Sequence, residues 1–558
     1  MKAKHYLLIA CTALLIQSCG LLGIHLKVHN PNKAGKNPKF SRESVLLGEM
    51  TPLRSCYDVH YYDIAIAFDA DEKSLDGTVE IHATAEADFT LLQIDLHPNF
   101  TIKKLIDQAG NNVLKYTQEE RAIIIELTKK KGDDFIIEVA YEGKPVKAKK
   151  PPWKGGLVWK KDKEKNDWLG VACESEGASL WWPLKDHTAD EPDSLRLHYT
   201  IPKGLMAVGN GQFEGMESSG DLNTYNWFVS YPINTYNVSF YVGDFVEIKD
   251  TYKGINGKEL AISHFVLKKN EKKAREHFKQ INNILKIYEE VFGEYPWYRD
   301  GFKLIESPYA GMEHQTAIAY GNGYKNDLYG VDYIILHEIA HEWWGNSVTA
   351  VDLNDVWIQE GFATYAEALY FEKAEGSSQY RSHLQFNRIF IKNKYPVVGV
   401  KDRRWFHFRK GSDAYMKGAW ILHTLRQQLK DDSLFFKIIQ DFYKQSTYQI
   451  VESKDFIELV NQKTQKDYSW FFEQYLYNNF APQLEYTIDE GTLYYRWTKV
   501  GKNFNQLKIK CRSAMKTIVL TPSTEIQTLK LSDNSDEDNT LFLGESLYAV
   551  KENKKLKK

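Results

Sequence analysis

Two histidines one helical turn apart are the residues of this chain best placed to do chemistry. His337 and His341 are four positions apart, so on a helix their imidazoles would lie one above the other and could bind one ion together. Apolar residues from Tyr333 to Trp344 surround the pair and predict a central, buried helix. A catalytic zinc takes three nitrogen or oxygen ligands and leaves a fourth position for water. Glu360, with eighteen residues between it and His341, is the candidate third ligand, so the spacing predicts one Zn²⁺ per chain.

Two further glutamates fit around such an ion. Glu338 lies about 100° further round the helix than His337, where it cannot bind the ion comfortably but can reach a water held there, as a general base. Glu367 is seven residues after Glu360 and could orient a ligand imidazole from behind, although a surface glutamate fits the spacing equally well. The competing interpretation is a pair of core histidines without a metal. It is disfavoured because a buried pair without a partner would be costly.

The length and charge of the chain limit the classes of protein it can be. With 558 residues it exceeds what one hydrophobic core usually supports, which favours three domains. Its net charge of −2 and pI near 6.8 argue against a nucleic-acid partner, which would need a basic face. Cys56, Cys173 and Cys511 would remain after processing of the N-terminus and are too few for a disulfide framework. Stability must therefore come from packed cores, and the oligomeric state stays open.

The first residues predict a targeting signal. Lys2 and Lys4 precede an apolar run that is too short to cross a membrane and ends shortly before Cys19. Residues 1–18 resemble a bacterial lipoprotein signal peptide, which implies cleavage before Cys19, lipid on its sulfur and a spacer over residues 19–50. A plain secretory peptide is the alternative. The implied location is the bacterial cell envelope, with a lipid anchor in a membrane, and the lack of an acidic run after Cys19 favours the periplasmic face.

Hydrophobic periodicity divides the rest of the chain into three parts. Residues 51–266 read as short alternating runs separated by turn signals, which predicts an N-terminal antiparallel β domain. Residues 267–480 change to helical spacing, with a broad apolar face over residues 274–292, and predict a mainly α domain that contains the metal site. Residues 481–558 return to short β runs and end in a basic tail. The predicted fold class is multidomain α+β.

With these motifs in place, the chain resembles the zinc aminopeptidases of the gluzincin group, peptidase family M1, which includes aminopeptidase N and leukotriene hydrolase. That family has the same two histidines and the same eighteen-residue spacing to a glutamate, and its second histidine is followed by residues like Trp343 to Asn346 here. The resemblance covers most of the chain. It implies a thermolysin-like catalytic domain and a zinc-dependent enzyme that removes the N-terminal residue from peptide substrates.

The family binds the free α-amine of its substrate partly through a Gly-x-Met-Glu-Asn motif. Here the motif stands at residues 310–314, upstream of the metal helix. The resemblance therefore assigns Glu313 to the substrate amine and places Gly311 and Met312 in the same substrate-binding site. Tyr309, just before the motif, is a candidate to line the pocket for the first side chain of the substrate.

A second amine-binding carboxylate is implied in the β domain, where the family's Gln-x-Glu stands as Ala172-Cys173-Glu174. The resemblance gives Glu174 that role. Two opposed carboxylates are also what a buried ammonium requires, since an unpaired buried charge is very costly. Ala172, Ala310 and His314 replace residues of the family pattern, so the preferred N-terminal side chain of the substrate stays open.

Tyr415 completes the set of residues that the resemblance implies. It begins Tyr-Met-Lys-Gly at residues 415–418, where the family's tyrosine donates a hydrogen bond to the oxyanion formed during attack. One alternative is an endopeptidase that does not use the amine clamp. Another is a lipid-tethered binding protein that captures peptides without cutting them, and it is disfavoured because all three ligands, the base and Tyr415 are present.

Overall fold

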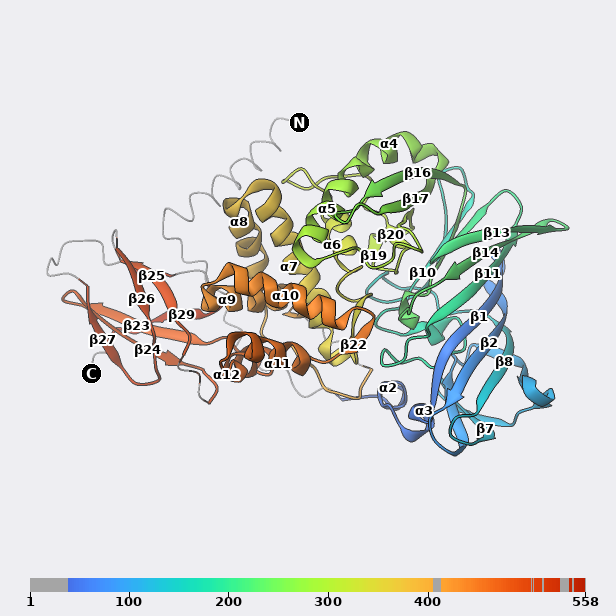
Figure 1. The fold of residues 1–558 in the computed structure, drawn as a ribbon, viewed down its shortest axis with the longest axis horizontal. Helices are drawn as coiled ribbons and strands as arrows, with labels where there is room; N and C mark the ends of the chain where they lie inside the picture. Colours follow the sequence, from blue (N-terminus) through green and yellow to red (C-terminus); the bar gives the residue numbers. More distant parts are fainter. Residues whose placement is uncertain are drawn as a thin grey trace.

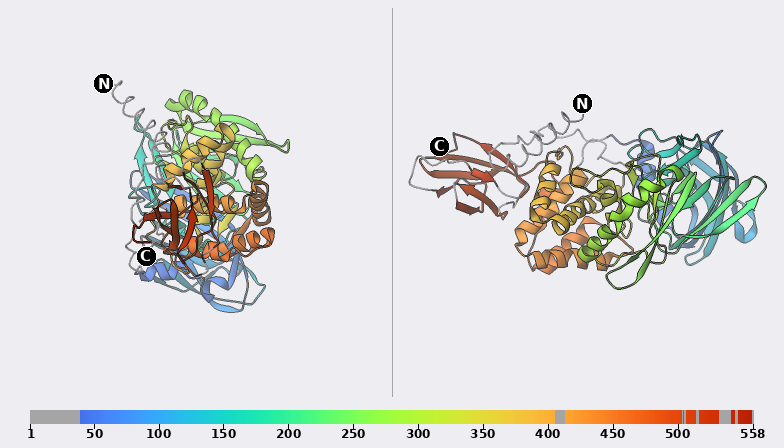
Figure 2. Two further views of the ribbon diagram at one scale, coloured as in Figure 1. Left: turned by 90° about the vertical axis from the view of Figure 1, so that its left-hand side faces the viewer. Right: turned by 90° about the horizontal axis from the view of Figure 1, so that it is seen from above.

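The structure is a computed structural model of the chain. Its described residues are 39–404, 413–502, 504, 506–513, 516–531, 541–543 and 546–556. The predicted signal peptide, Cys19 and the last two lysines lie outside them. A β region lies at one end of the molecule, a helical region in the middle and a small β region at the other end (Figure 1, Figure 2). This arrangement confirms the predicted multidomain α+β fold.

The N-terminal region is built from three sheets. The first has eight strands, in the spatial order β13 (Gln212–Ser219), β14 (Leu222–Val229), β11 (Ser194–Pro202), β1 (Tyr57–Asp69), β2 (Ser74–Ala85), β8 (Asp134–Gly143), β4 (Phe100–Asp107) and β5 (Asn112–Val113). The second contains β12 (Met206–Gly209), β15 (Phe240–Gly243), β10 (Asp167–Ala172) and β9 (Gly156–Lys161), and the third β3 (Phe89–Asp95), β7 (Ala122–Lys129) and β6 (Tyr116–Glu119). Alternate residues of β2 are buried, as a period-two pattern predicts. β1 pairs with β11 in parallel, so the sheet is mixed rather than purely antiparallel as predicted. The alternation of apolar and polar residues shows which face of a strand is buried, but it does not show the direction of the strand.

A five-stranded sheet crosses the predicted division at residue 266. Its strands are, in spatial order, β16 (Phe245–Lys253), β17 (Glu259–Leu267), β18 (Leu304–Glu306), β20 (Ile318–Tyr320) and β19 (Gly311–Met312). The last three strands lie in the segment expected to be mainly helical. They have only two or three residues each, which is too short to show an alternating pattern. The sheet matters for function because it brings the motif at residues 310–314 beside the β region.

The chain before the first sheet is partly helical. Its two helices are α2 (Arg42–Gly48) and α3 (Pro52–Ser55). Leu47 of α2 is buried, and the hydroxyl of Ser44 donates to the carbonyl of Arg404 (2.9 Å). The part of the predicted spacer that is described, residues 39–50, therefore packs on the folded domains. The polar composition of this segment did not predict the packing, because only one face of a short helix is buried.

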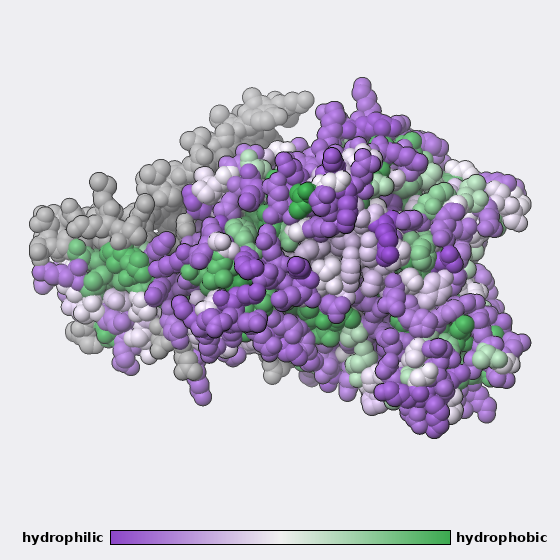
Figure 3. Space-filling model, in the orientation of Figure 1, coloured by the Kyte–Doolittle hydropathy of each residue, from purple (hydrophilic) through white to green (hydrophobic). Residues whose placement is uncertain are grey.

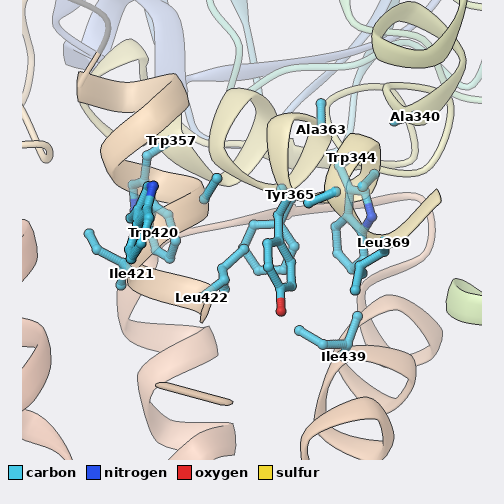
Figure 4. Packing of buried hydrophobic residues seen from close by; sticks show 14 of the residues in the cluster. Ala340, Trp344, Trp357, Ala363, Tyr365, Leu369, Trp420, Ile421, Leu422 and Ile439 are labelled. Atoms are coloured by element: carbon cyan, nitrogen blue, oxygen red, sulfur yellow. The ribbon is translucent and has the colours of Figure 1, made fainter. Parts of the chain in front are cut away.

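Nine α-helices of the described residues form the central region. They are α4 (Glu271–His277), α5 (Ile281–Phe292), α6 (Tyr333–Ala340), α7 (Trp357–Glu375), α8 (Ser377–Arg388), α9 (Gly418–Leu429), α10 (Asp432–Ser446), α11 (Ser453–Thr464) and α12 (Ser469–Leu476). α7 is central, since every residue in its first fifteen positions is buried. Figure 4 shows Trp344, Tyr365, Leu369, Trp420 and Ile439 packed together between α7, α9 and α10.

Three details of the helical region differ from the sequence-based expectation. The face over residues 274–292 belongs to two helices, α4 and α5, with a 3₁₀ turn over Phe278–Gln280 between them. Helix α6 ends at Ala340, so Trp343 lies in a turn and Trp344 in a β-bridge with Val348 rather than on the helix. α8 and α12 were not predicted, and neither were the paired short strands β21 (Val348–Ala350) and β22 (Gln449–Val451).

The C-terminal region contains two small sheets, as predicted. Their strands are β27 (Gln527–Lys530), β24 (Thr492–Thr498), β23 (Gln483–Asp489) and β29 (Ala549–Glu552) in one, and β26 (Lys516–Leu520), β25 (Ile509–Ser513) and β28 (Leu541–Leu543) in the other. The face shown in Figure 3 is mainly hydrophilic, with a hydrophobic patch at this end of the molecule. None of the helices in the described ranges is both long enough and apolar enough to span a bilayer.

Candidate active site

Three ligand atoms converge between α6 and α7. His337 lies in the last turn of α6, His341 caps its end, and Glu360 lies in the first turn of α7. Nε2 of His337 is 3.2 Å from Nε2 of His341 and 3.2 Å from Oε2 of Glu360, and Nε2 of His341 is 3.4 Å from the same oxygen. The ligand atoms of a tetrahedral zinc with bonds of about 2.0–2.1 Å lie about 3.3–3.4 Å apart. The three atoms therefore have the mutual spacing that a zinc ion needs.

The hydrogen bonds of the two imidazoles also fit a metal site. Nδ1 of His341 donates to the carbonyl of Trp344 (2.8 Å), and Nδ1 of His337 donates to Oε1 of Glu367 (2.7 Å). A neutral imidazole that donates from Nδ1 carries a lone pair on Nε2. Two such lone pairs and a carboxylate oxygen then face one another in a buried site, which is unfavourable unless they bind a cation. The donor set, the tautomers and the spacing all fit Zn²⁺.

Glu367 joins the ligand imidazole to a third helix. Its other oxygen accepts a hydrogen bond from Nε2 of His383 in α8 (2.9 Å). Burial raises the pKa of Glu367, but the hydrogen bonds from His337 and His383 outweigh that effect and hold the pKa at about 2. Spacing alone left open whether this residue orients a ligand or lies at the surface. Its buried, doubly bonded carboxylate favours the orienting role.

Glu338 faces the same space as the triad without belonging to it. One ligand-type atom each of Glu338, Glu313 and His341 lies within 4.8 Å of the others. Burial raises the pKa of Glu338 to about 8, against the opposing effect of His337. Gly311 makes room for this carboxylate, because a Cβ at that position would lie 2.5 Å from Oε1 of Glu338. A buried carboxylate next to the metal ligands is well placed to move a proton.

Glu313 and Glu174 add two more carboxylates to the cleft. Glu313 follows β19 directly, and Glu174 follows β10 by two residues, so the five-stranded sheet and the β region bring them together. The hydroxyl of Tyr236 donates to Oε1 of Glu313 (3.2 Å). Burial raises the pKa of Glu174 well above its ordinary value, and the nearby carboxylates of Glu313 and Glu360 raise it further. Oε1 of Glu174 is buried without a hydrogen-bond partner among the described residues. The pair is therefore open to a positively charged group.

Tyr415 lies over the metal ligands. It is part of a π-helical turn, Asp413–Lys417, just before α9. Its ring stacks on the imidazole of His337, with centroids 5.9 Å apart and an interplanar angle of 19°. Burial raises the pKa of Tyr415 well above its ordinary value, and Glu360 and Glu174 raise it further. The hydroxyl therefore keeps its proton and can act as a hydrogen-bond donor.

The remaining predicted substrate-binding residues form the back wall of this site. Tyr309 and Met312 are buried in the core of the β region, and the Tyr309 hydroxyl donates to the carbonyl of Val171 (2.5 Å). His314 is also buried, with Nδ1 2.5 Å from the hydroxyl of Tyr241. Burial lowers the pKa of His314 to about 3, so this imidazole is neutral. His314 is thus a packed, uncharged side chain directly after Glu313.

Sequence reasoning missed the residues that hold these groups in place. Gln359 donates to the hydroxyl of Tyr236 (2.9 Å), and Asn346 donates to the backbone carbonyl of Glu313 (2.8 Å). Gln359 and Asn346 stand within the motifs around the ligands, where their polar side chains in an otherwise apolar run were a usable signal. Tyr236 and His383 reach the site only through the folding of distant segments and have no local signal.

The site places a His–His–Glu triad between two helices, with further carboxylates opposite it. Residues 277–475 match the Peptidase family M1 domain. This range contains the triad, Glu338, Glu313 and Tyr415. The family match therefore covers the part of the chain that holds most of the candidate site.

The curated relatives are longer than this chain. The leucyl aminopeptidase of Saccharolobus solfataricus is 21% identical over 435 residues, which are 74% of this chain and 52% of that protein. The glutamyl aminopeptidase of Sus scrofa is 28% identical over 300 residues, which are 49% of this chain and 31% of that protein. The chain thus spans about half the length of the first relative and less of the second.

Solved structures extend the likeness to the fold. The M1 zinc metallopeptidase from Deinococcus radiodurans has a TM-score of 0.64 at 19% identity, covering 78% of this chain and 96% of that one. A mutant of the same protein bound to a Tyr-Ser-Ala substrate has the same TM-score, identity and coverage. Since the likeness extends over nearly the whole of those chains, the arrangement of β region and helical region is shared.

Proposed function

We propose that this protein is a zinc-dependent aminopeptidase, which hydrolyses the N-terminal peptide bond of peptide substrates. The observation that carries the proposal is the pair Glu313 and Glu174, two buried carboxylates beside the zinc triad. Within the described ranges, neither forms an ion pair with a lysine or arginine, and one oxygen of Glu174 has no hydrogen-bond partner. A compact ammonium, such as the free α-amine of a peptide, is the cation that completes this site.

His337, His341 and Glu360 would hold the zinc. Such an ion supplies Lewis-acid polarisation of the scissile carbonyl and makes water acidic enough to react near neutral pH. Glu338 takes the proton of the attacking water and returns it to the departing amine. Tyr415 donates a hydrogen bond to the oxygen on which negative charge develops, a contribution of about 10²- to 10³-fold in rate.

Blocking the substrate amine tests the proposal against the endopeptidase alternative. We expect kcat/KM for a short peptide to fall about 100-fold or more when its N-terminus is acetylated, because one partner of a buried charge pair is lost. Glu313→Gln and Glu174→Gln should shrink this preference. Equal rates on free and acetylated peptide would rule out the aminopeptidase.

Replacing the base tests the mechanism against the binding-protein alternative. Glu338→Gln keeps the shape of the side chain but cannot accept the proton, so we expect kcat to fall about 10²- to 10⁴-fold. Zinc content, measured by atomic emission, should be unchanged because Glu338 is not in the triad. A wild-type protein that binds peptides but does not hydrolyse them would support the alternative of a peptide-binding protein.

We further propose that the mature chain is anchored by lipid on Cys19 to a membrane of the bacterial envelope and faces the periplasm. The N-terminal sequence supports this, since residues 1–18 combine basic residues, an apolar run and a cysteine at the cleavage point. Cys19→Ser should move the protein from the detergent phase to the aqueous phase of a Triton X-114 partition. Aqueous partition of the wild type would contradict the anchor and support a plain secretory peptide.

A further inference from the structure

A second cavity lies between the β region and the catalytic region, apart from the zinc site. It has a volume of about 410 Å³. One wall comes from β13 and β14 at the edge of the eight-stranded sheet, and the other from β17 and the segment over residues 299–303. Small-molecule sites in proteins commonly have volumes of about 300–1,000 Å³. The cavity is therefore large enough for a ligand of its own.

Aromatic side chains dominate its walls. The ring of Phe213 lies 5.0 Å from that of Trp227 and 6.2 Å from that of Tyr225, and Trp227 lies 6.0 Å from Phe265 across the two regions. Phe213 is nevertheless 53% exposed. A large exposed aromatic ring that belongs to a cluster lining a cavity is typical of a surface that binds an apolar group.

A buried cation faces the same cavity. Lys303 lines it and is 3% exposed. Its ammonium donates to the carbonyl of Gly211 and lies 5.6 Å from the ring centroid of Trp227. Within the described part of the chain no carboxylate oxygen comes within the 4.0 Å of an ion pair to this ammonium. The nearby Asp300 is engaged elsewhere, since both of its oxygens accept from Ser230.

These two features specify one kind of ligand. A buried ammonium with donors to spare favours an anion in direct contact, because Asp300 and Glu342 act on it only from beyond ion-pair distance. The acidic side chains of Asp300 and Glu247 also line the cavity, so a polyanion such as a nucleotide would be repelled. The aromatic walls require a flat apolar group. A monocarboxylate with an aromatic body satisfies all three conditions.

We propose that this cavity binds a small aromatic carboxylate, with its carboxylate on Lys303 and its ring against Phe213 and Trp227. Two sources share this chemistry, a free aromatic amino acid and an aromatic acid without an amine. The site is separate from the cleft but is joined by hydrogen bonds to the segment that follows Glu313. Gly211, which accepts from Lys303, donates its N–H to the hydroxyl of Thr316 (2.9 Å), three residues after Glu313.

Titration calorimetry with three matched probes tests the proposal on the full zinc-loaded chain. Indole-3-propionate has the ring and the carboxylate, tryptophan adds the amine, and indole-3-propionamide keeps the ring but lacks both the carboxylate and the amine. We expect the first two to bind and indole-3-propionamide to bind at least about tenfold more weakly, because it cannot make the charge-assisted bond. Tighter binding of tryptophan than of indole-3-propionate would identify an amino acid as the ligand, and the reverse would identify a simple aromatic acid.

Two variants place the binding in this cavity. Lys303→Met and Phe213→Ala should each weaken the binding of indole-3-propionate at least about fivefold. Phe213 is half-exposed, so its replacement should leave the fold intact. Trp153→Ala is the matched control, because Trp153 is 48% exposed and lies outside the cavity. Peptide turnover should be unchanged in Phe213→Ala. Absence of binding up to about 10 mM, equal binding of indole-3-propionamide, or binding that survives Phe213→Ala would each overturn the proposal.

The pH dependence of binding is a further check. Burial lowers the pKa of Lys303 to about 8, although Asp300 and Glu342 act to raise it. Arg299 and Glu247 also line the cavity. The affinity for indole-3-propionate should therefore fall as the pH rises from 7 through 8 to 9.5, and this fall should be absent in Lys303→Met. Equal affinity at both ends of the range in the wild type would contradict the assignment of the carboxylate to this lysine.

Discussion

Replacement of Glu367 should weaken zinc binding, although Glu367 is not itself one of the three predicted zinc ligands. The carboxylate bridges two helices, because it accepts from Nδ1 of His337 in α6 (2.7 Å) and from Nε2 of His383 in α8 (2.9 Å). In Glu367→Ala the Nδ1–H of His337 loses its acceptor in a buried place. The ring is then free to rotate and to shift its proton to Nε2, where the zinc must bind.

The size of the effect follows from these contacts. Loss of an outer hydrogen-bond partner typically weakens a metal site about 10- to 100-fold, or about 1.4 to 2.7 kcal/mol. A hydrogen bond to a charged group contributes about 1.5 to 3 kcal/mol. The Glu367 carboxylate is ionised and its side chain is 11% exposed, so little water can replace it. We therefore expect a loss near the upper end, about 30- to 100-fold in the zinc dissociation constant.

Two independent measurements can detect this change. Competition with a chromophoric chelator gives the dissociation constant directly. Thermal unfolding gives it through linkage: zinc at 1,000 times the wild-type dissociation constant stabilises the fold by about 4.1 kcal/mol, and a 100-fold weaker site would leave about 1.4 kcal/mol. The melting temperature of the zinc-free protein should differ much less between wild type and variant than that of the loaded protein.

Two controls separate charge, orientation and helix stability. Glu367→Gln can still accept from His337 but has no charge, so its zinc affinity should lie between those of the wild type and Glu367→Ala. Glu372→Ala removes a carboxylate from the same helix that pairs with Arg426 instead, and it should leave zinc affinity unchanged. If Glu367→Ala binds zinc within about twofold of the wild type, the orienting role is refuted.

Three further changes have defined outcomes. Burial lowers the pKa of His264 to about 3, so below pH 6.5 the unfolded chain binds a proton that the folded chain does not. The free energy of unfolding should therefore fall by about 1.4 kcal/mol per pH unit between pH 6 and 4. Urea titrations should show a smaller slope in His264→Asn. Gly311→Ala places a Cβ 2.5 Å from Oε1 of Glu338, so steady-state kinetics should show a lower kcat with normal zinc content. Tyr236→Phe removes a hydrogen bond to Glu313, and KM for free peptides should rise about fivefold, while KM for acetylated peptides stays constant.

The metal site was predictable because its geometry is local. The spacing of His337 and His341 fixes them on one turn, and Glu360 needs only a second helix to begin shortly after the first ends. Helix α6 stops at Ala340, yet His341 still meets His337, since the capping residue keeps helical dihedrals. The spacing of the polar residues was therefore a better predictor of the metal site than the length of the helix.

Helix α8 could not be predicted because half of its buried face is polar. Tyr380, His383, Leu384 and Asn387 are its buried residues, at the spacing of one helical face. Only two of them are apolar or aromatic, so the hydrophobic period is incomplete. The polar pair is buried because Glu367 of α7 meets His383, a tertiary contact that no local pattern encodes. Functional positions on this helix were hidden for the same reason.

The charges of the cleft explain why a free amine should be required. Glu174, Glu313, Glu338 and Glu360 are all buried in one space and carry a formal charge of −4 when ionised. No lysine or arginine in the described ranges forms an ion pair with any of them. Zinc and one ammonium offset three of these negative charges, whereas with an acetylated peptide zinc alone offsets two. In the proposed aminopeptidase the substrate amine is thus a counter-ion for the site as well as a recognition element.

A consequence is that the protonation of the substrate should limit activity at high pH. The α-amine of a peptide has a pKa of about 7.7–8.0, so kcat/KM should fall about tenfold per unit above pH 8.5. A second substrate can show whether this fall in kcat/KM comes from the substrate amine or from a group of the enzyme. A second peptide with a less basic amine should move the fall to lower pH by the difference between the two pKa values. A fall that stays at the same pH for both peptides would come from the enzyme, and the amine would then not be the counter-ion of this cleft.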